Sequence, residues 1–430
     1  MFLDSLTRLA RSARIARVAA TVFASYKVPE LASWVLGRAT RRPDAAGRSA
    51  THRRNARLIF DTALSLRGLL IKMCQVIGTR SDIFPPEYVK VLAQCHDRLP
   101  ARPFEEIRRQ VEGELGGRLS DFYREFAPTP LAAASLAQVH RAVLRDGRVV
   151  AVKVQYPDIE DIVRLDIANV TRICRVYQLV DRQPLELLPL LDELTRHLAL
   201  ELDFRREADN ADRVRGLFAD DPGVVVPAIH RDLSTRRVLT MEFVDGIKVT
   251  DVAGLRQAGL DPAEVVQTLM RVYTRMILAY GFFHADPHPG NLFVRPGGAV
   301  VLLDFGLAKD LPPGFGLALF ELMFAMMTLN EVSMLKAFEQ LGFRTKSGDS
   351  GWLVELARRM VDVSGKRFEG ELTEDMTEEL FNAVRENPVV QVPSDFVLVG
   401  RAFGLLSGIA HTLGSRANVL EAMAPGPLRA

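Results

Sequence analysis

Two acidic side chains and an amide lie around a Pro/Gly-rich loop and a short apolar hairpin in residues 282–309, FFHADPHPGNLFVRPGGAVVLLDFGLAK. Asp286 and Asn291 are five residues apart, and Asp304 follows thirteen residues later, directly before Phe-Gly. Phosphoryl transfer uses this order: a loop acid facing the attacking hydroxyl or water, an amide that holds a metal, and a second, metal-binding acid. Because Mg²⁺ prefers hard oxygen ligands, we expect Asn291 and Asp304 to bind Mg²⁺ and Asp286 to be catalytic.

A lysine at the end of the apolar stretch VAVK is the second part of the pattern. Lys153 would project its ammonium from one face of a sheet towards phosphate oxygens, and such a lysine needs a carboxylate to hold it. The helical stretch ELDFRREADNADR offers Glu201, Asp203 and Glu207. We assign Glu207 to Lys153; Glu201, six residues earlier, lies on another face of the helix and is left for a different cation. A solvated acidic helix is the alternative interpretation.

The periodicity of apolar residues predicts a helical extension followed by two lobes. Residues 1–36 form a basic amphipathic segment, 37–57 read as a linker, and 58–125 read as a helical extension. Alternating apolar and polar residues predict a small antiparallel sheet with a helix in an N-lobe over 126–246. Helical periodicity dominates a C-lobe over 247–430. The predicted fold is therefore α+β and two-lobed, as in protein kinases.

Local signals place individual elements within these parts. Apolar residues at helical spacing predict a helix that begins at Leu58 and includes KMCQ, residues 72–75, and another helix over 104–124. Asp146 and Gly147 predict a tight hairpin turn between two strands.

Composition excludes several classes of protein. The 55 basic and 53 acidic side chains leave a formal charge of +2, so no global field favours nucleic acid as a partner. Cys74, Cys95 and Cys174 are few and far apart, which argues against a disulfide framework or a metal cluster and suits a reducing compartment. We therefore expect a cytoplasmic protein.

Membrane signals in the sequence are weak. The most apolar stretch, 396–413, contains Arg401 and His411 and is predicted to be a buried helix. The basic segment 1–36 has no uninterrupted apolar core, so a cleaved signal peptide is not expected. We expect this segment to pack on its own domain, and peripheral contact with the inner face of a membrane is the alternative.

The chain contains five motifs: AAASLAQVH, VAVKVQ, ELDFRREA, HADPHPGN and LLDFG. Together they resemble the UbiB family of atypical kinase-like proteins, also called the AarF or ADCK family, with its ABC1 kinase-like domain. The resemblance runs from about Leu58 to Leu413. Ordinary protein kinases differ at each motif: their catalytic loop has Arg where this chain has Ala285, and their nucleotide loop is rich in Gly. The resemblance implies a kinase-like fold that binds ATP with Mg²⁺.

The resemblance also implies a nucleotide site built on an Ala-rich loop. Ala adds a methyl group and narrows the φ range relative to Gly, so this loop is expected to hold nucleotide differently and to disfavour protein phosphorylation. Small residues in a strand bend are the alternative interpretation. The expected nucleotide-binding residues are Ala132, Ala133, Ala134, Ser135, Lys153, Glu242 and Val244.

In this family the motif Lys-x-Gly-Gln lies on a helix laid across the place where a protein substrate would bind. Lys72 and Gln75 are three residues apart and share a helical face. By resemblance, Lys72 pairs with Glu201 of the Glu-Leu-Asp motif, which ends at Asp203. Cys74 stands where the family has Gly, so its side chain bears on how closely the helix approaches the nucleotide. We expect Cys74 to be a small buried thiol rather than a redox group.

The leading hypothesis is an ATP-binding, Mg²⁺-dependent atypical kinase or ATPase that hydrolyses ATP or phosphorylates a small or lipid-like molecule. The resemblance implies a role in isoprenoid-quinone (ubiquinone-like) biosynthesis or lipid homeostasis, with ATP, ADP and a lipid or quinone precursor as partners. A nucleotide-gated scaffold that presents hydrophobic precursors without phosphoryl transfer is the alternative. An ordinary protein kinase is disfavoured by Ala285 and the Ala-rich loop.

Overall fold

A computed structural model describes residues 5–35, 45–78, 84–96, 101–180, 198–328, 330–345, 390–391 and 393–415, together with Leu188, Leu191 and Thr195. These residues form two compact units. Unit 1 draws on 1–205 and 230–241, and unit 2 on 206–229 and 242–430.

The predicted lobe boundary at 246 is corrected by this division. The segment 206–229, which lies within the predicted N-lobe, belongs to unit 2. The physical reason is that Ala211, Val214 and Phe218 are buried in the apolar core of unit 2.

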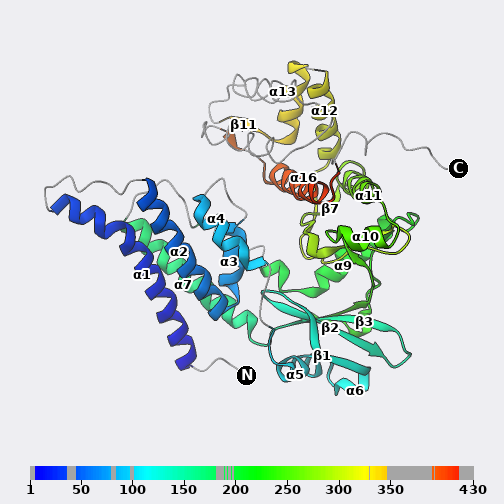
Figure 1. Cartoon of the computed structure of the whole chain (residues 1–430), viewed down its shortest axis with the longest axis horizontal. Coiled ribbons are helices and arrows are strands. Elements are labelled where there is room, and N and C mark those ends of the chain that lie inside the picture. The colour runs from blue at the N-terminus through cyan, green and yellow to red at the C-terminus, as the bar shows by residue number, and fades with distance from the viewer. Residues whose placement is uncertain are drawn as a thin grey trace. The chain divides into compact units, whose positions relative to one another are not determined.

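Unit 1 begins with helices that pack on one another. The helix α1 contacts α2 and α7, while α3 contacts α2, α4 and α7 (Figure 1). The helical elements of the unit are α1 (Ser5–Val35), α2 (Ala45–Leu66), α3 (Leu69–Gly78), α4 (Pro86–Leu92), η1 (Ala93–His96), α5 (Phe104–Leu115), α6 (Leu119–Phe122), α7 (Ile159–Val180) and η2 (Arg231–Leu233).

Three sequence predictions in this region need correction. The predicted linker 37–57 is helical from Ala45 onward, because Asn55 and Ala56 are buried against neighbouring helices and residues such as Ala and Arg favour a helix. The helix predicted from Leu58 ends at Leu66, and KMCQ lies on the separate helix α3. Arg67 and Gly68 both have positive φ, which breaks the helical path between the two.

The third correction concerns the predicted helix over 104–124. It divides into α5 and α6, because Gly116 takes a left-handed conformation that ends α5. The chain then enters a strand at Tyr123.

The sheet of unit 1 has the strand order β1-β2-β3-β5. Its strands are β1 (Tyr123–Ala133), β2 (Ala137–Leu144), β3 (Val149–Gln155) and β5 (Val238–Glu242), with β1, β2 and β3 successively antiparallel. The predicted hairpin turn is confirmed: Gly147 has φ of 92° and donates its N–H to the carbonyl of Leu144 at 3.0 Å. Val150, Val152 and Val154 on β3 are fully buried in the core beneath the sheet.

The N-terminal helix α1 docks on unit 1 through a buried arginine. Arg11 forms an ion pair with Asp166 of α7 at 2.6 Å and donates hydrogen bonds to the carbonyls of Leu66 (2.6 Å) and Arg67 (3.1 Å). Packing on its own domain, as predicted for this segment, is confirmed. Burial raises the pKa of Asp166, although the guanidinium of Arg11 opposes that shift.

Unit 2 is mainly helical, with short strands. Its helical elements are α9 (Phe204–Leu217, whose first two residues lie in unit 1), α10 (Val252–Gln257), α11 (Pro262–Thr274), η3 (Arg275–Tyr280), η4 (Pro289–Asn291), α12 (Phe315–Met327), α13 (Glu331–Leu341) and α16 (Ser394–Thr412). Its strands are β4 (Val224–Val225), β6 (Ile247–Lys248), β7 (Phe282–His284), β8 (Leu292–Val294), β9 (Val300–Leu302), β10 (Ala308–Asp310), β11 (Arg344–Thr345) and β12 (Val390–Gln391).

Two small sheets of unit 2 support the loops predicted to carry chemistry. One has the order β4-β9-β8-β6, and β7 pairs with β10 in a second. The segment 396–413, predicted to be a buried helix, lies almost wholly in α16, and Val399, Ala402, Phe403 and Leu406 belong to the core. In the described part of the chain, no helix combines the length and apolarity that crossing a bilayer requires.

Candidate functional site

A buried histidine links the two acidic segments of unit 2. His284, 1% exposed at the end of β7, has its Nε2 2.5 Å from the carbonyl oxygen of Asp304. Its Nδ1 accepts the N–H of Asp286 at 3.3 Å, so the neutral ring carries its proton on Nε2 and donates it to Asp304. The ring also packs edge-on against Phe305. The structure therefore brings the backbones of Asp286 and Asp304 together, and a shared site for their side chains stays a prediction.

Asp304 itself adopts an uncommon backbone conformation. Its φ is +59°, in the left-handed region, where Asp is tolerated better than most side chains. The carbonyl contact with His284 and a hydrogen bond from the N–H of Gly306 to Oδ1 at 3.3 Å stabilise this conformation. Asn291 is close by along the backbone, because its carbonyl accepts the N–H of Leu303 at 2.9 Å.

The carboxylate of Asp286 has a partner that the sequence did not reveal. Arg401 on α16 places Nη2 3.3 Å from Oδ1 of Asp286. In the sequence, Arg401 appeared only as a charge that interrupts an apolar helix. A separation of 115 residues gives no local signal for this contact.

The helix α9 brings Glu207 into the same unit. Glu207 is 4% exposed, and Asn210, three residues later, donates from Nδ2 to the carbonyl of Phe305 at 3.0 Å. Residues three apart on a helix are neighbours, so Glu207 lies close to the segment that follows Asp304. Its predicted partner Lys153 belongs to unit 1, and that ion pair stays a prediction.

The two remaining predicted residues of unit 2 are Glu242 and Val244. Glu242, at the end of β5, forms an ion pair with Arg295 at 3.4 Å and accepts the N–H of Ala228 at 3.3 Å. Val244 is partly buried in the segment between β5 and β6. Their contact with nucleotide stays a prediction.

In unit 1 the sheet register aligns the Ala-rich loop with the lysine. Ala132 on β1 pairs with Val139 on β2, and Val139 pairs with Lys153 on β3. Residues paired directly across strands share one face of a sheet, so Ala132 and Lys153 face the same side, roughly 10 Å apart. Lys153 also places its Nζ 5.2 Å from the centre of the Phe204 ring.

The Ala-rich loop is a tight connection between β1 and β2. Ala132 and Ala133 end β1, and the N–H of Ala134 donates to the carbonyl of Ala137 at 2.8 Å. The hydroxyl of Tyr156 donates to the carbonyl of Ala134 at 3.1 Å, and Ser135 is buried. The loop therefore lies where a kinase nucleotide loop connects its first two strands.

The ion pair predicted between Lys72 and Glu201 is confirmed. Lys72 Nζ lies 2.5 Å from Glu201 Oε1, and the two side chains are 21% and 15% exposed. Gln75 donates to the carbonyl of Cys95 at 3.2 Å and thereby holds α3 against η1.

Cys74, on the same helix, points into a separate small core. It is 1% exposed among Phe60, Ala63, Leu92 and Cys95, and its thiol is hydrogen-bonded to that of Cys95. This hydrogen bond and burial both raise the pKa of Cys74. The prediction of a small buried thiol is confirmed.

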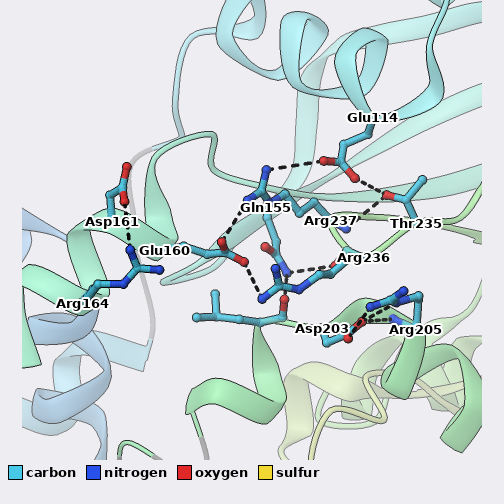
Figure 2. A network of polar contacts seen from close by, with 11 residues as sticks. Glu114, Gln155, Glu160, Asp161, Arg164, Asp203, Arg205, Thr235, Arg236 and Arg237 are labelled. Atoms are coloured by element: carbon cyan, nitrogen blue, oxygen red, sulfur yellow. Dashed lines mark hydrogen bonds and ion pairs between the residues drawn. The ribbon is translucent and has the colours of Figure 1, made fainter. Parts of the chain in front are cut away.

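A polar network fixes the Glu-Leu-Asp motif to the sheet (Figure 2). Gln155, fully buried at the end of β3, donates from Nε2 to the carbonyls of Leu202 (2.9 Å) and Arg236 (3.3 Å). Figure 2 also shows Asp203 bound by Arg205, and that hydrogen-bonded ion pair of 2.9 Å lowers the pKa of Asp203.

The same network reaches two helices and the segment before β5. Arg236 and Arg237 pair with Glu160 of α7 at 2.8 and 2.9 Å, and Arg237 pairs with Glu114 of α5 at 3.5 Å. Thr235 donates its hydroxyl to the other oxygen of Glu114 at 2.6 Å (Figure 2). The position of Glu201 and Asp203 thus depends on contacts with elements far away in the sequence.

The oxygen ligands of Asn291 and Asp304 suit a hard cation whose coordination is completed by phosphate. Among the described residues, no three His, Cys, Asp or Glu side chains gather closely enough to hold a metal by themselves. Asn291 and Asp304 offer an amide oxygen and a carboxylate, and Mg²⁺ in phosphoryl-transfer sites takes its other ligands from phosphate and water. The residues therefore fit a nucleotide-bound Mg²⁺.

Comparison with known proteins identifies the family. The model of the ABC1 atypical kinase-like domain matches residues 94–338, a range that contains Lys153, Glu207, Asp286 and Asp304. The chain belongs to the ABC1 atypical kinase-like family. The predicted resemblance to UbiB and AarF proteins is thereby confirmed.

Named relatives agree with this assignment. The chain is 36% identical over 393 residues to AarF domain-containing protein kinase 1 of Mus musculus, covering 86% of this chain and 72% of that protein. It is 32% identical over 376 residues to the chloroplastic ACTIVITY OF BC1 COMPLEX KINASE 7 of Arabidopsis thaliana, covering 87% of this chain and 54% of the relative. The chain thus spans about half to two thirds of the length of several curated ABC1 relatives.

A solved structure confirms the fold. A Mycobacterium tuberculosis protein determined in complex with erythromycin matches with a TM-score of 0.61 and 21% identity, covering 89% of this chain and 97% of that one. At this identity the similarity concerns the fold alone. The predicted α+β, two-lobed kinase-like fold is confirmed.

Proposed function

We propose that this ABC1-family protein binds ATP with Mg²⁺ and acts as an atypical kinase or ATPase. The observation that carries the proposal is a set of hydrogen bonds in unit 2 that holds the segments of three predicted residues, Asp286, Asp304 and Glu207. His284 binds the backbones of Asp286 and Asp304, and Asn210 fastens the helix of Glu207 to the residue after Asp304. These hydrogen bonds support the proposal because they hold the expected catalytic acid and an expected Mg²⁺ ligand in one part of unit 2.

Each side chain has a role that follows from its chemistry. Lys153 neutralises α- and β-phosphate oxygens and is held by Glu207. Asn291 and Asp304 hold Mg²⁺, which when bound neutralises charge on the transferred phosphoryl group. Asp286 orients the attacking hydroxyl or water and accepts its proton.

We further propose that the acceptor is water or a small, lipid-like molecule, such as a precursor of an isoprenoid quinone. The Ala-rich loop supports this, since it replaces the Gly residues of protein kinases. We also propose that the protein acts in the cytoplasm, with peripheral contact at the inner face of a membrane. On α1, Leu6 (72% exposed) and Leu9 (68%) are apolar side chains that could make this contact.

Nucleotide binding and turnover test the proposal. We expect ATP and ADP with Mg²⁺ to raise the melting temperature of the purified protein, and ATP to be hydrolysed or consumed. Asp304→Asn should abolish the metal-dependent shift, because an amide replaces the anionic ligand. Unchanged affinity and turnover in Asp304→Asn, or no nucleotide effect on the wild type, would overturn the assignment.

One contact favours a second candidate, a nucleotide-gated scaffold that presents hydrophobic precursors without transferring phosphate. The Lys72–Glu201 ion pair holds the helix that this family lays across the substrate position. Radiolabelled ATP separates the two candidates: free phosphate or a labelled small molecule supports the enzyme, and binding without release supports the scaffold.

A further inference from the structure

The carboxylate of Asp286 is bound by an arginine from a distant helix. Arg401 Nη2 lies 3.3 Å from Asp286 Oδ1, and the two side chains are 39% and 28% exposed. Both residues belong to unit 2, and α16, which carries Arg401, is anchored in the core of that unit by Val399, Ala402 and Phe403. The guanidinium therefore extends from a rigid element.

The loop around Asp286 has no cation of its own. The sequence from 282 to 294 contains neither Lys nor Arg, and Ala285 stands directly before the acid. His288 uses Nδ1 to accept the N–H of Gly290 at 3.1 Å. Nearby cations are paired elsewhere, Arg295 with Glu242 and Lys309 with Asp395. The charge beside Asp286 is thus supplied by Arg401.

We propose that Arg401 is a positioning residue that fixes the carboxylate of Asp286 for the transfer step. His284 holds the backbone of Asp286, but a side chain still rotates about its own bonds. The contact of Arg401 with Oδ1 restricts that rotation and leaves Oδ2 to face the acceptor hydroxyl or water. The inference rests on the proposed function, because it needs Asp286 to act on an acceptor.

The test uses the full chain and separates turnover from binding. We expect Arg401→Gln to lower kcat for ATP turnover at least tenfold while KM for ATP and the nucleotide-induced melting shift stay unchanged, because misplacement affects the reacting geometry and not the phosphates. Arg401→Lys keeps the charge and should recover part of kcat. In the Asp286→Asn background, Arg401→Gln should add little, because the two residues act together.

A matched variant controls for loss of α16 anchoring. Lys309→Gln removes another ion pair that ties α16, through Asp395, to the segment after Asp304, and should leave kcat within twofold. If Arg401→Gln lowers the melting temperature more than Lys309→Gln does, the double mutant Asp286→Asn/Arg401→Gln decides. Additive losses of kcat in that double mutant mean that Arg401 has a structural role, and they overturn the inference. Wild-type kcat in Arg401→Gln overturns it alone, whereas no turnover in the wild type overturns the proposed function and the inference with it.

Discussion

The two units hold their parts of the predicted site by different physical means. In unit 1, Glu201 and Asp203 are positioned by side chains that reach between elements, namely Lys72 from α3 and Gln155 from β3. In unit 2, a single buried imidazole, His284, binds the backbones of both acidic segments. The first arrangement is a set of separate polar contacts, and the second depends on one side chain embedded in an apolar core.

This difference predicts how each part responds to mutation. In unit 1 the contacts are separate, so one can be lost without the other, and the partly exposed Lys72–Glu201 pair contributes little by itself. A buried group that satisfies two backbone partners leaves both unsatisfied when it is removed, and the cost is correspondingly larger. We therefore expect removal of one side chain, His284, to destabilise unit 2 strongly, whereas unit 1 should lose stability in smaller steps as its separate contacts are removed.

His284→Ala should have the largest effect. It removes the contacts with Asp286 and Asp304 and leaves a cavity beside Phe305, so the free energy of unfolding should fall by about 3–4 kcal/mol. Urea denaturation measures this loss. His288→Ala, on the same loop, removes the acceptor of the Gly290 N–H and should cost about 1 kcal/mol. If both variants lost the same free energy of unfolding, unit 2 would not depend on His284 in particular, and the contrast with the separate contacts of unit 1 would disappear.

Gln155→Leu should have an intermediate effect that shows in nucleotide binding as well as in stability. The buried carbonyl of Leu202 loses its donor, and the carbonyl of Arg236 keeps only the N–H of Phe204, which together cost about 2 kcal/mol. Gln138→Leu is the matched control, since Gln138 is a buried glutamine on the neighbouring strand whose partners are Arg102 and His140. Both variants should lose similar stability, but Gln155→Leu alone should weaken ATP binding, by roughly tenfold. Equal ATP affinity in both would show that Gln155 serves the fold only.

Lys72→Met should have a smaller effect, because the ion pair with Glu201 is partly exposed. We expect a loss of about 1 kcal/mol, as Glu201 keeps access to water. Arg57→Met breaks an exposed pair with Asp61 and should not change stability measurably. A loss of more than 3 kcal/mol in Lys72→Met would mean that unit 1 also depends on one central contact.

A pH effect in unit 1 should be the smallest. Burial lowers the pKa of His140, whose Nδ1–H donates to the carbonyl of Ala127 while Nε2 accepts from Gln138. The unfolded chain then binds a proton that the folded chain resists, so the stability contribution is complete above about pH 6.5 and is lost as pH falls below that value. Only the pH interval between the folded and unfolded pKa contributes, at up to about 1.4 kcal/mol per pH unit, so a modest lowering of the pKa gives a small loss.

Urea midpoints at pH 7.5 and pH 5.5 measure this dependence. His140→Gln should reduce the difference between the two midpoints, because it removes the titrating group. His411→Gln, at an exposed position on α16, should leave the difference unchanged. The idea fails if both variants keep the pH dependence of the wild type.

Much of the fold could be predicted from the sequence because short motifs determine their own local backbone geometry. The turn at Gly147, the buried helix at 396–413 and the Lys72–Glu201 pair follow from glycine conformation, apolar periodicity and family resemblance. The start of α2 was not readable, since its polar, Arg-rich residues lack an apolar stripe and its helix depends on packing of Asn55 and Ala56. The unit boundary was missed for the same reason, because α9 joins unit 2 through buried contacts.

The sequence alone determined the chemical identities and the order of the side chains, from Lys153 to Asp304, because residue type and spacing along a chain are local properties. Tertiary structure alone decided the partners: Arg401 for Asp286, Asn210 for Phe305 and Gln155 for Leu202. These pairs are separated by 115, 95 and 47 residues. No periodicity links such distant positions, since only the packing of their helices and strands brings them within hydrogen-bond distance.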